Sequence, residues 1–305
     1  MRVVFMGTPE YATRILEALL TWEKCEVVGV LSQPDKPAGR KMELKPPHVK
    51  EFLHTFYPAV PLFQPTSLKT PDIQETLRAL APDVIVVAAY GQLLPQTVLD
   101  IAPCINLHAS LLPKYRGASP IQAAILAGDT YTGVSAMLME KGLDTGAVLG
   151  LGYLPLKMDM SAPEVFEALA SCAAKLTLRT LEQRSTLAPL AQRNALACYA
   201  PKITKIDGVV DFSLESAALY RRFQALTPWP GLSLANGVKL LTLSLESTTG
   251  AYTPGEILAL DQEGVVIGCK KGTLRVMRVQ APSKKPLHVK EYLTGKRSGV
   301  GALFS

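Results

Sequence analysis

The sequence predicts an α/β protein whose first domain holds a doubly wound, mostly parallel sheet of the Rossmann-like kind, followed by a small β-barrel or sheet domain. Three observations lead to this prediction. In the first half, short apolar runs alternate with amphipathic segments. Those runs are apolar on both faces, as in a parallel sheet covered by helices. The last third instead holds alternating strands broken by glycine turns.

The elements of the first half follow in order along the chain. RVVFMG is the first predicted strand, and Thr8 as N-cap with Pro9 at the first helical position begins an amphipathic helix. Later segments continue the alternation: strands in CEVVGVLSQ, DVIVVAAYG, CINLH and GVSAMLME, and helices in PDIQETLRAL, SPIQAAILAG and Pro163–Gln183. We therefore expect one large domain over residues 1–189.

A change of character marks the second domain. Residues 190–206 show no sustained period and are predicted to be a linker. Beyond them, KLLTLSLE, GEILALD and GVVIGCKKGTLRVMRVQ alternate in the manner of antiparallel strands. The small domain is expected over residues 207–305. It carries 12 Lys and Arg against 8 Asp and Glu, a net charge of +4 out of +6 for the whole chain.

The bulk composition is that of a globular protein, with 305 residues, 48% hydrophobic and 19% charged. Its moderate basicity suits a polyanionic partner, although a solvated basic face is the commoner explanation. The five cysteines are scattered and form no CxxC pair, which favours free thiols over a zinc site or disulfides. No apolar run approaches the 18 or so residues of a membrane span. We expect a soluble cytoplasmic protein.

Asn106 and His108 are the first candidates for chemistry. They stand two apart in CINLH, so their side chains share one face of a predicted strand. The segment SLLP then continues into a loop, which places both side chains at the carboxyl edge of the sheet, where open parallel sheets bind ligands. From spacing alone, a structural role in capping the loop backbone is equally plausible.

Asp144 favours the chemical interpretation. It lies in KGLDTGAVL, a glycine-flanked loop typical of backbone brought close to a ligand. An Asp beside a His orients the ring and favours its charged form. Together the amide, imidazole and carboxylate can stabilise an oxyanion and move a proton, as acyl transfer requires. No Ser or Cys with an elbow sequence accompanies them, which favours direct transfer between two bound substrates.

Other motifs give weaker signals. FMGTPE resembles a dinucleotide-binding junction but contains only Gly7 of the three glycines that the fingerprint needs. There is no Walker A sequence and no HExxH motif. Residues 34–50 form a predicted long loop with five positive and two negative charges, suited to phosphate contact, although a mobile surface loop has the same composition.

These motifs, taken in order, resemble those of one family. FMGTPEYA, PDKPAGR, VVAAYGQLLP, INLHASLLPKYRGASPIQAAILAGD, GLDTGAVL, YAPKITK and TPWPG are similar to segments of the methionyl-tRNA formyltransferases. The central block is specific for formyltransferases that use 10-formyltetrahydrofolate, whereas YAPKITK, TPWPG and the loop at residues 34–50 favour the tRNA-acting members. The resemblance covers the chain from about Arg2 to its final segment.

The resemblance implies a reaction and its participants. The enzyme would transfer a formyl group from 10-formyltetrahydrofolate to the amino group of initiator methionyl-tRNA, without a metal, as a monomer. Its C-terminal domain would be an OB-like barrel that binds the tRNA. The alternative in the same class is a formyltransferase for another amine, such as an amino-sugar nucleotide or glycinamide ribonucleotide. A non-catalytic folate-binding or RNA-binding module is the alternative from another class.

The resemblance also assigns residues. Asn106, His108 and Asp144 match the family's catalytic residues. The folate would be held by Ser110, Leu111, Leu112 and Pro113, with Tyr90, Gly91, Leu93, Leu94, Lys141, Gly142 and Leu143 around the pterin. The tRNA would meet Arg40, Lys41 and Lys45. The chain departs from the family's usual pattern at Lys41–Glu43 and at Pro47–His48, which affects contacts between loop and tRNA rather than the chemistry.

Overall fold

The computed structural model describes residues 1–38 and 42–305 and divides the chain into two compact units. Unit 1 comprises residues 1–120, 131–155 and 165–200, and unit 2 comprises residues 121–130, 156–164 and 201–305. Each unit is considered by itself. Unit 2 therefore includes two short segments from the middle of the sequence as well as its C-terminal third.

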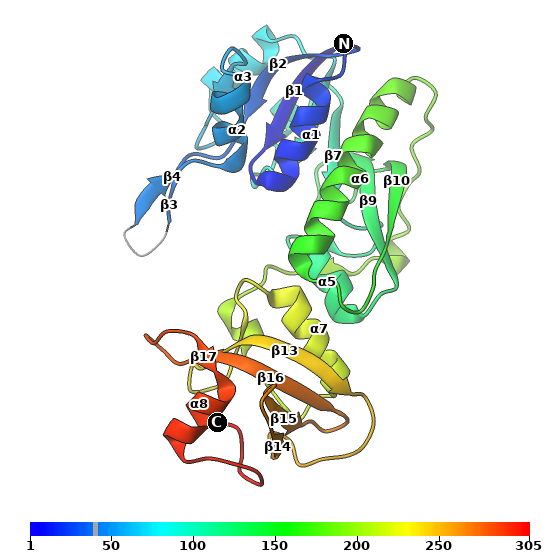
Figure 1. Ribbon diagram of the computed structural model, residues 1–305. Helices are drawn as coiled ribbons and strands as arrows, with labels where there is room; N and C mark the ends of the chain where they lie inside the picture. The colour runs from blue at the N-terminus through cyan, green and yellow to red at the C-terminus, as the bar shows by residue number, and fades with distance from the viewer. Residues whose placement is uncertain (39–41) are drawn as a thin grey trace. The chain divides into compact units, whose positions relative to one another are not determined.

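Unit 1 is built on a mostly parallel sheet (Figure 1). In the described part of the chain the sheet has seven strands in the order β10-β9-β7-β6-β1-β2-β5. Their bounds are β1 Arg2–Gly7, β2 Glu26–Leu31, β5 Leu62–Phe63, β6 Val84–Ala88, β7 Cys104–His108, β9 Tyr131–Leu138 and β10 Val148–Pro155. The strands from β7 to β5 pair in parallel, whereas β9 is antiparallel to β7 and β10 is antiparallel to β9.

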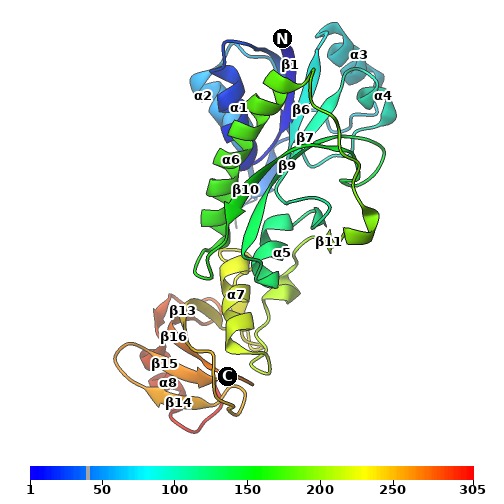
Figure 2. The ribbon, with the colours of Figure 1, turned by 90° about the vertical axis from the view of Figure 1, so that its right-hand side faces the viewer.

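Helices cover both faces of this sheet, which confirms the predicted doubly wound arrangement. Figure 2 shows α1, α2 and α6 on one side and α3 and α4 on the other. Their bounds are α1 Glu10–Leu20, α2 His48–Phe56, α3 Pro71–Ala79, α4 Gln96–Leu99 and α6 Ala162–Gln183. The core on the α3 side includes Met6 and Val87 from the sheet and Leu77 from α3, each almost fully buried. On the other side, Tyr11 of α1 packs edge-on against Phe166 of α6, with ring centroids 5.7 Å apart.

Three local predictions for unit 1 need correction. Helix α1 starts one residue later than expected, because Pro9 is the N-cap and the Thr8 hydroxyl donates instead to the Tyr90 carbonyl oxygen. Residues 34–50 are not an unstructured loop: β3 Lys36–Ala38 and β4 Glu43–Lys45 form an antiparallel hairpin, and α2 follows directly. Strand β10 was not predicted at all.

Residues 190–200 extend along unit 1. Leu190 bridges to Val148, and β11 Tyr199–Ala200 pairs in parallel with β8 Arg116–Gly117. The short helix η1 Asn194–Leu196 lies between these contacts. We call residues 190–200 the return segment, because they bring the chain back to the residues that follow β7.

Unit 2 contains the antiparallel sheet that the sequence predicts. Its strands run in the order β12-β13-β16-β15-β14, and β17 also pairs with β16. Their bounds are β12 Leu232–Ser233, β13 Lys239–Ser247, β14 Ile257–Leu260, β15 Val265–Gly268, β16 Thr273–Gln280 and β17 Leu287–His288. The helices of this unit are α5 Pro120–Ala127, η2 Lys205–Gly208, α7 Ser216–Leu226 and α8 Val289–Lys296. No helix in the described residues has the length and apolar character needed to cross a membrane.

Candidate active site

Strand β7 presents Asn106 and His108 on one face, as their spacing predicts. The strand is internal, hydrogen-bonded to β6 on one side and to β9 on the other, so its backbone is fixed from both sides. Asn106 is half-buried and His108 is 7% exposed. Among the residues that the structure describes, the side-chain amide of Asn106 has no hydrogen-bond partner. It is therefore available to a ligand.

His108 and Asp144 come together although they are 36 positions apart. The His108 Nδ1 atom lies 3.6 Å from the Asp144 Oδ2 atom, and both side chains are almost buried, at 7% and 11% exposure. The other ring nitrogen, Nε2, donates to the Tyr115 carbonyl oxygen at 2.9 Å. Each ring nitrogen thus faces an oxygen, which fixes the orientation of the imidazole ring.

The backbone around Asp144 is adapted to this contact. Asp144 has a φ of 53°, in the left-handed region that Asp tolerates better than most residues. Two positions further on, a Cβ at Gly146 would lie 1.7 Å from the Leu138 carbonyl oxygen, so this loop requires glycine to pass so close to β9. The Asp144 Oδ2 atom also accepts a hydrogen bond from the Gly117 amide at 2.8 Å.

The SLLP segment leaves β7 through a set of internal hydrogen bonds. The Ser110 hydroxyl donates to the Lys114 carbonyl oxygen at 2.6 Å. Ser135 of β9 links both ends of the segment, because its hydroxyl donates to the Ser110 carbonyl oxygen and accepts from the Leu112 amide. Leu112 is buried, the Leu112–Pro113 peptide is cis, and Leu111 is half-buried. The hydrogen bonds of Ser110 and Ser135 therefore hold the SLLP segment in place next to His108.

The other predicted folate residues have mixed exposure. Tyr90 is 2% exposed, its hydroxyl has no partner in the described residues, and burial raises its pKa to about 12. Gly91 has a φ of 85° and Leu94 is buried. Leu93 and Leu143, by contrast, are 80% and 51% exposed. Lys141 and Gly142 are exposed beside Leu143.

Two residues that the sequence-based predictions omit, Arg116 and Gln192, connect the return segment to the site. Arg116 is 2% exposed, and its Nε and Nη2 atoms donate to the Gln192 Oε1 atom at 3.0 and 2.8 Å. Nη2 also donates to the Asn194 Oδ1 atom at 2.9 Å. The Gln192 Nε2 atom donates to the carbonyl oxygens of Asp144 and Gly146. The one signal in the sequence was an arginine close behind the SLLP segment.

The predicted tRNA-binding residues are only partly covered by the structure. Arg40 and Lys41 lie outside the described residues. Lys45 is exposed on β4. The base of the hairpin is held by Asp35, whose carboxylate accepts from the Lys50 ammonium at 2.9 and 2.8 Å and from the Gln64 amide at 2.8 Å. These hydrogen bonds lower the pKa of Asp35, the contact with Lys50 most strongly.

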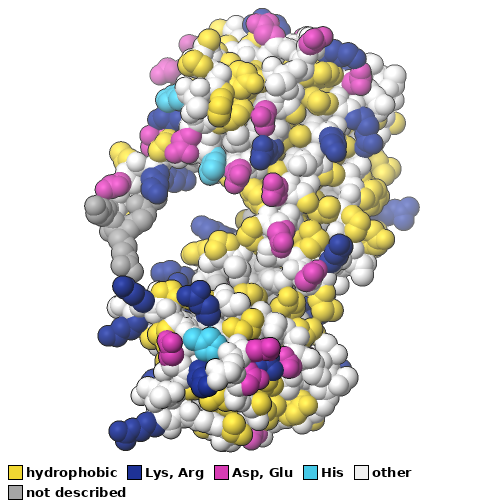
Figure 3. All heavy atoms as spheres, in the orientation of Figure 1, with side chains coloured by type: hydrophobic (Ala, Val, Ile, Leu, Met, Phe, Trp, Pro, Cys, Tyr) yellow, Lys and Arg dark blue, Asp and Glu magenta, His cyan; other side chains and the backbone are white. Residues whose placement is uncertain are grey.

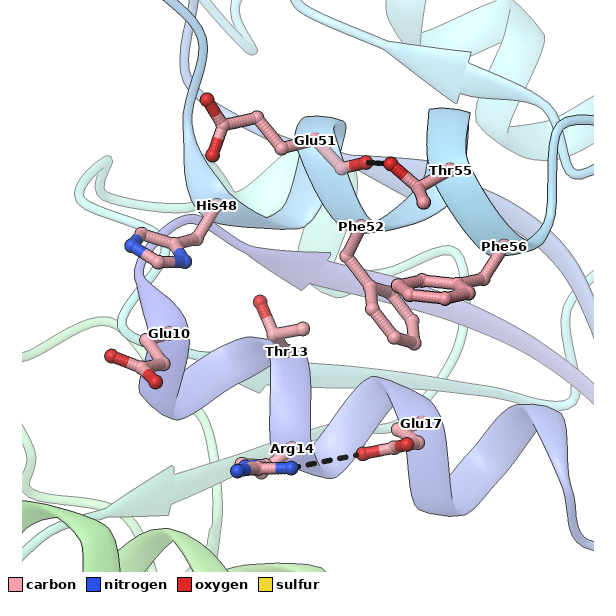
Figure 4. A pocket seen from close by; sticks show the side chains of 9 residues that line it. All are labelled: Glu10, Thr13, Arg14, Glu17, His48, Glu51, Phe52, Thr55 and Phe56. Carbon is pink, nitrogen blue, oxygen red and sulfur yellow. Dashed lines mark hydrogen bonds and ion pairs between the residues drawn. The ribbon is translucent and has the colours of Figure 1, made fainter.

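A pocket of about 390 Å³ lies away from these residues, between α1 and α2 (Figure 4). Thr13 points from α1 toward the rings of Phe52 and Phe56, and the charged side chains of Glu10, Arg14 and Glu51 lie at the rim. None of the predicted site residues lines it. Among the described residues, no group of three or more His, Cys, Asp and Glu side chains could hold a metal ion.

Comparison with known families covers almost the whole chain. Residues 1–181 match the family described as "Formyl transferase", and residues 202–297 match "Formyl transferase, C-terminal domain". The methionyl-tRNA formyltransferase of Nitratiruptor sp. is 51% identical over 100% of both chains. That of Wolinella succinogenes is 53% identical over 99% of this chain and 98% of its own. These values confirm the resemblance predicted from the motifs.

Solved structures share the fold at much lower identity. An N-formyltransferase from Helicobacter canadensis, crystallised with folinic acid and dTDP-3-aminofucose, matches with a TM-score of 0.67 and 16% identity over 90% of this chain and 98% of its own. HypX from Aquifex aeolicus, in complex with tetrahydrofolic acid, matches with a TM-score of 0.65 and 20% identity. That match covers 98% of this chain and 48% of HypX, so the chain spans about half the length of HypX.

Proposed function

Because the chain belongs to the methionyl-tRNA formyltransferase family, we propose that it transfers the formyl group of 10-formyltetrahydrofolate to the α-amino group of initiator methionyl-tRNA. The product is N-formylmethionyl-tRNA, which initiates translation. The observation that carries the proposal is the cluster of Asn106, His108 and Asp144. Within the described residues the Asn106 side-chain amide has no partner, and it lies on a fixed strand beside the His–Asp pair.

The reaction needs a neutral amine, a stabilised oxyanion and a proton path. Esterification of methionine to tRNA removes the carboxylate charge and so lowers the pKa of its α-amine. The amine lone pair attacks the formyl carbon, and the carbonyl π electrons move onto oxygen. The Asn106 amide donates to that oxygen, and the His108 ring lies beside it on the same face of the strand. One such donor is worth about 3 kcal/mol of barrier.

Collapse of the intermediate breaks the bond between the formyl carbon and N10 of the folate. One proton leaves the attacking nitrogen and one arrives at N10, so tetrahydrofolate departs neutral at that atom. Asp144 orients the His108 ring and orders a water that carries the proton between the two nitrogens. The carboxylate is suited to this role because its Oδ2 atom is fixed by the Gly117 amide beside the ring.

The remaining assignments complete the proposal. Residues 1–189 form the catalytic domain and residues 207–305 the tRNA-binding domain, in a monomeric cytoplasmic enzyme. Residues 190–206 link them, and the first part of this linker, the return segment, packs on unit 1. The SLLP segment, the backbone around Tyr90 and the loop at Lys141–Leu143 hold the folate. Lys45, with Arg40 and Lys41, contacts the tRNA. On the face drawn in Figure 3, unit 2 carries several Lys and Arg side chains with Asp and Glu between them.

Formylation of an amino-sugar nucleotide is the weaker alternative. The same three side chains would perform it, because the attacking group is again an amine. Relatives that are about half identical over the full chain are named for methionyl-tRNA, whereas the sugar-formylating structure is 16% identical. The balance of similarity therefore favours the tRNA.

The test supplies formyl-labelled 10-formyltetrahydrofolate and compares four acceptors. These are initiator methionyl-tRNA, elongator methionyl-tRNA, a dTDP-amino sugar and glycinamide ribonucleotide. We expect the label on the initiator tRNA, with a much slower reaction on the elongator. Label on a small amine acceptor and on neither tRNA would refute the proposed substrate while leaving the formyl transfer in place.

A further inference from the structure

Gln192 makes two kinds of contact that no other side chain in the return segment combines in the described structure. Its side-chain carbonyl oxygen accepts two hydrogen bonds from the buried Arg116 guanidinium. Its amide nitrogen donates to the Asp144 carbonyl oxygen at 2.9 Å and to the Gly146 carbonyl oxygen at 2.7 Å. All four polar functions of the side chain are therefore used, and its own orientation is fixed from both ends.

The partners of Arg116 explain why a neutral amide stands at this position. A guanidinium that is 2% exposed must have its donors satisfied. Here two amide oxygens, from Gln192 and Asn194, accept hydrogen bonds from its Nε and Nη2 atoms. A glutamate at position 192 would pair with Arg116 but would turn a carboxylate oxygen toward two carbonyl oxygens. An amide, unlike a carboxylate, can both accept from the guanidinium and donate to the backbone of the Asp144 loop.

The backbone that Gln192 holds is the one that aims the Asp144 carboxylate. The Asp144 carbonyl is bonded to Gln192, and the Asp144 carboxylate lies between the Gly117 amide and the His108 ring. The left-handed φ of Asp144 is a conformation that surrounding contacts must maintain. Gln192 supplies two such contacts, at Asp144 itself and two residues later.

We propose that Gln192 is a positioning residue for the catalytic reaction. Held by Arg116, it fixes the loop at Asp144–Gly146 so that the carboxylate stays beside His108. The expected effect on kcat rests on the proposed function, whereas the expected effect on the position of the Asp144 carboxylate does not. It differs from a purely structural role in one respect: losing the two donors of Gln192 changes the His108–Asp144 contact even when the fold is intact.

The matched pair for the test is Gln192→Leu and Asn194→Ala. Both remove an acceptor from Arg116, but only Gln192→Leu also removes the donors to Asp144 and Gly146. With initiator methionyl-tRNA and 10-formyltetrahydrofolate, we expect Gln192→Leu to lower kcat on the order of 10- to 100-fold. Its KM values should change by less than about threefold, since the misplaced group acts in the transition state. Asn194→Ala should retain nearly the wild-type kcat.

A second measurement does not depend on activity. The chain has four histidines, so a histidine-labelled sample gives four ring signals in a carbon–proton NMR spectrum, and His108→Gln assigns the one from the site. We expect Gln192→Leu to shift the His108 signal and to leave the other three in place. Asn194→Ala should leave all four in place. The three unchanged signals also show that the variant is folded.

Gln192→Glu is the second variant, used if Gln192→Leu does not fold. It keeps acceptors for Arg116 and loses the donors, so it should show the same loss of kcat and the same shift. Three outcomes would each overturn the inference. The first is a wild-type kcat in a folded Gln192 variant, and the second is an unmoved His108 signal in that variant. The third is an equal loss of kcat in Gln192→Leu and Asn194→Ala. If the wild-type protein were inactive but Gln192→Leu still shifted the His108 signal, the proposed function would be refuted. The conclusion that Gln192 positions the Asp144 loop would stand.

Discussion

At the residue scale, the chemistry depends on the side-chain amide of Asn106, which makes no hydrogen bond within the described structure. Asn106 sits on an internal strand, so its backbone cannot relax toward a substitute partner. A donor side chain on a fixed backbone needs little reorganisation when negative charge develops near it. Such donors therefore act mainly on the transition state.

Asn106→Ala should therefore affect rate far more than stability. We expect kcat to fall on the order of 10²- to 10³-fold. The melting temperature should change little, because no hydrogen bond within the described residues is lost. Single-turnover kinetics with saturating tRNA would measure the chemical step. A kcat within about threefold of wild type would exclude the oxyanion role.

The sequence alone could predict two of the three central residues with their geometry. The alternation of a strand places Asn106 and His108 on one face wherever the strand lies. The contact between His108 and Asp144 instead depends on a loop that returns to β7. Gln192 lies 48 positions from Asp144 in a segment without periodicity, so nothing local indicates that it reaches the site.

At the element scale, glycine accounts for the strand that the sequence did not reveal. Strand β10 contains Gly150 and Gly152, which weaken the local preference for a strand. The structure shows why small residues are needed there. A Cβ at Gly152 would lie 2.4 Å from the Cys172 Sγ atom of α6. Close packing between strand and helix is thus the reason for the weak signal.

The β3–β4 hairpin was hidden for a different reason. Lys36 and Pro37 of β3 and all three residues of β4 are exposed, and each strand is three residues long, which is too short for a period of two to stand out. What anchors the hairpin is polar: the Asp35, Lys50 and Gln64 side chains at its base. Such an anchor joins residues far apart and leaves no pattern in the sequence.

The contact between Lys50 and Asp35 leads to a prediction about pH. The Lys50 contact is the largest cause of the lowered pKa of Asp35, so Lys50→Met should raise that pKa toward its ordinary value of 3.8. Because the folded pKa is lowered, the stabilising contribution of the carboxylate is present above the unfolded pKa and is lost as the pH falls through the folded one. Titration of the Asp35 carboxyl signal by NMR would measure the shift.

Lys50→Arg is the control, because it keeps a positive donor in the same place. If the hairpin contacts tRNA, Lys50→Met should also raise KM for tRNA while KM for the folate stays near the wild-type value. An unchanged Asp35 pKa in Lys50→Met would show that the contact does not persist in solution.

At the scale of the whole molecule, the composition alone shows that positive charge is concentrated in the C-terminal part of the chain. The C-terminal 99 residues hold a net +4 of the total +6. What composition could not show is that unit 2 also takes residues 121–130 and 156–164 from the middle of the chain. Contacts that cross so much sequence are set by tertiary packing, which no local pattern encodes.

The charge leads to a prediction about salt. Lys284 and Lys285 are exposed between β16 and β17, and their double replacement by alanine removes two positive charges. If both contact phosphate, the slope of log Kd for tRNA against log salt concentration should fall by up to about two. Lys69→Ala, an exposed lysine of unit 1, should leave the slope unchanged. Equal slopes in wild type and the double variant would assign these lysines to solvent.

The pairing of β8 with β11 has a consequence for how the enzyme is made. The described strands of the unit 1 sheet are complete by residue 155, and chains fold from the N-terminal end during synthesis. The partners of Tyr115 and Arg116, however, are Cys198 and Gln192, 83 and 76 positions later. A growing polypeptide can therefore have its sheet while still lacking the bonds that shape its catalytic centre. Competence for catalysis should appear only after residue 200 has left the ribosome.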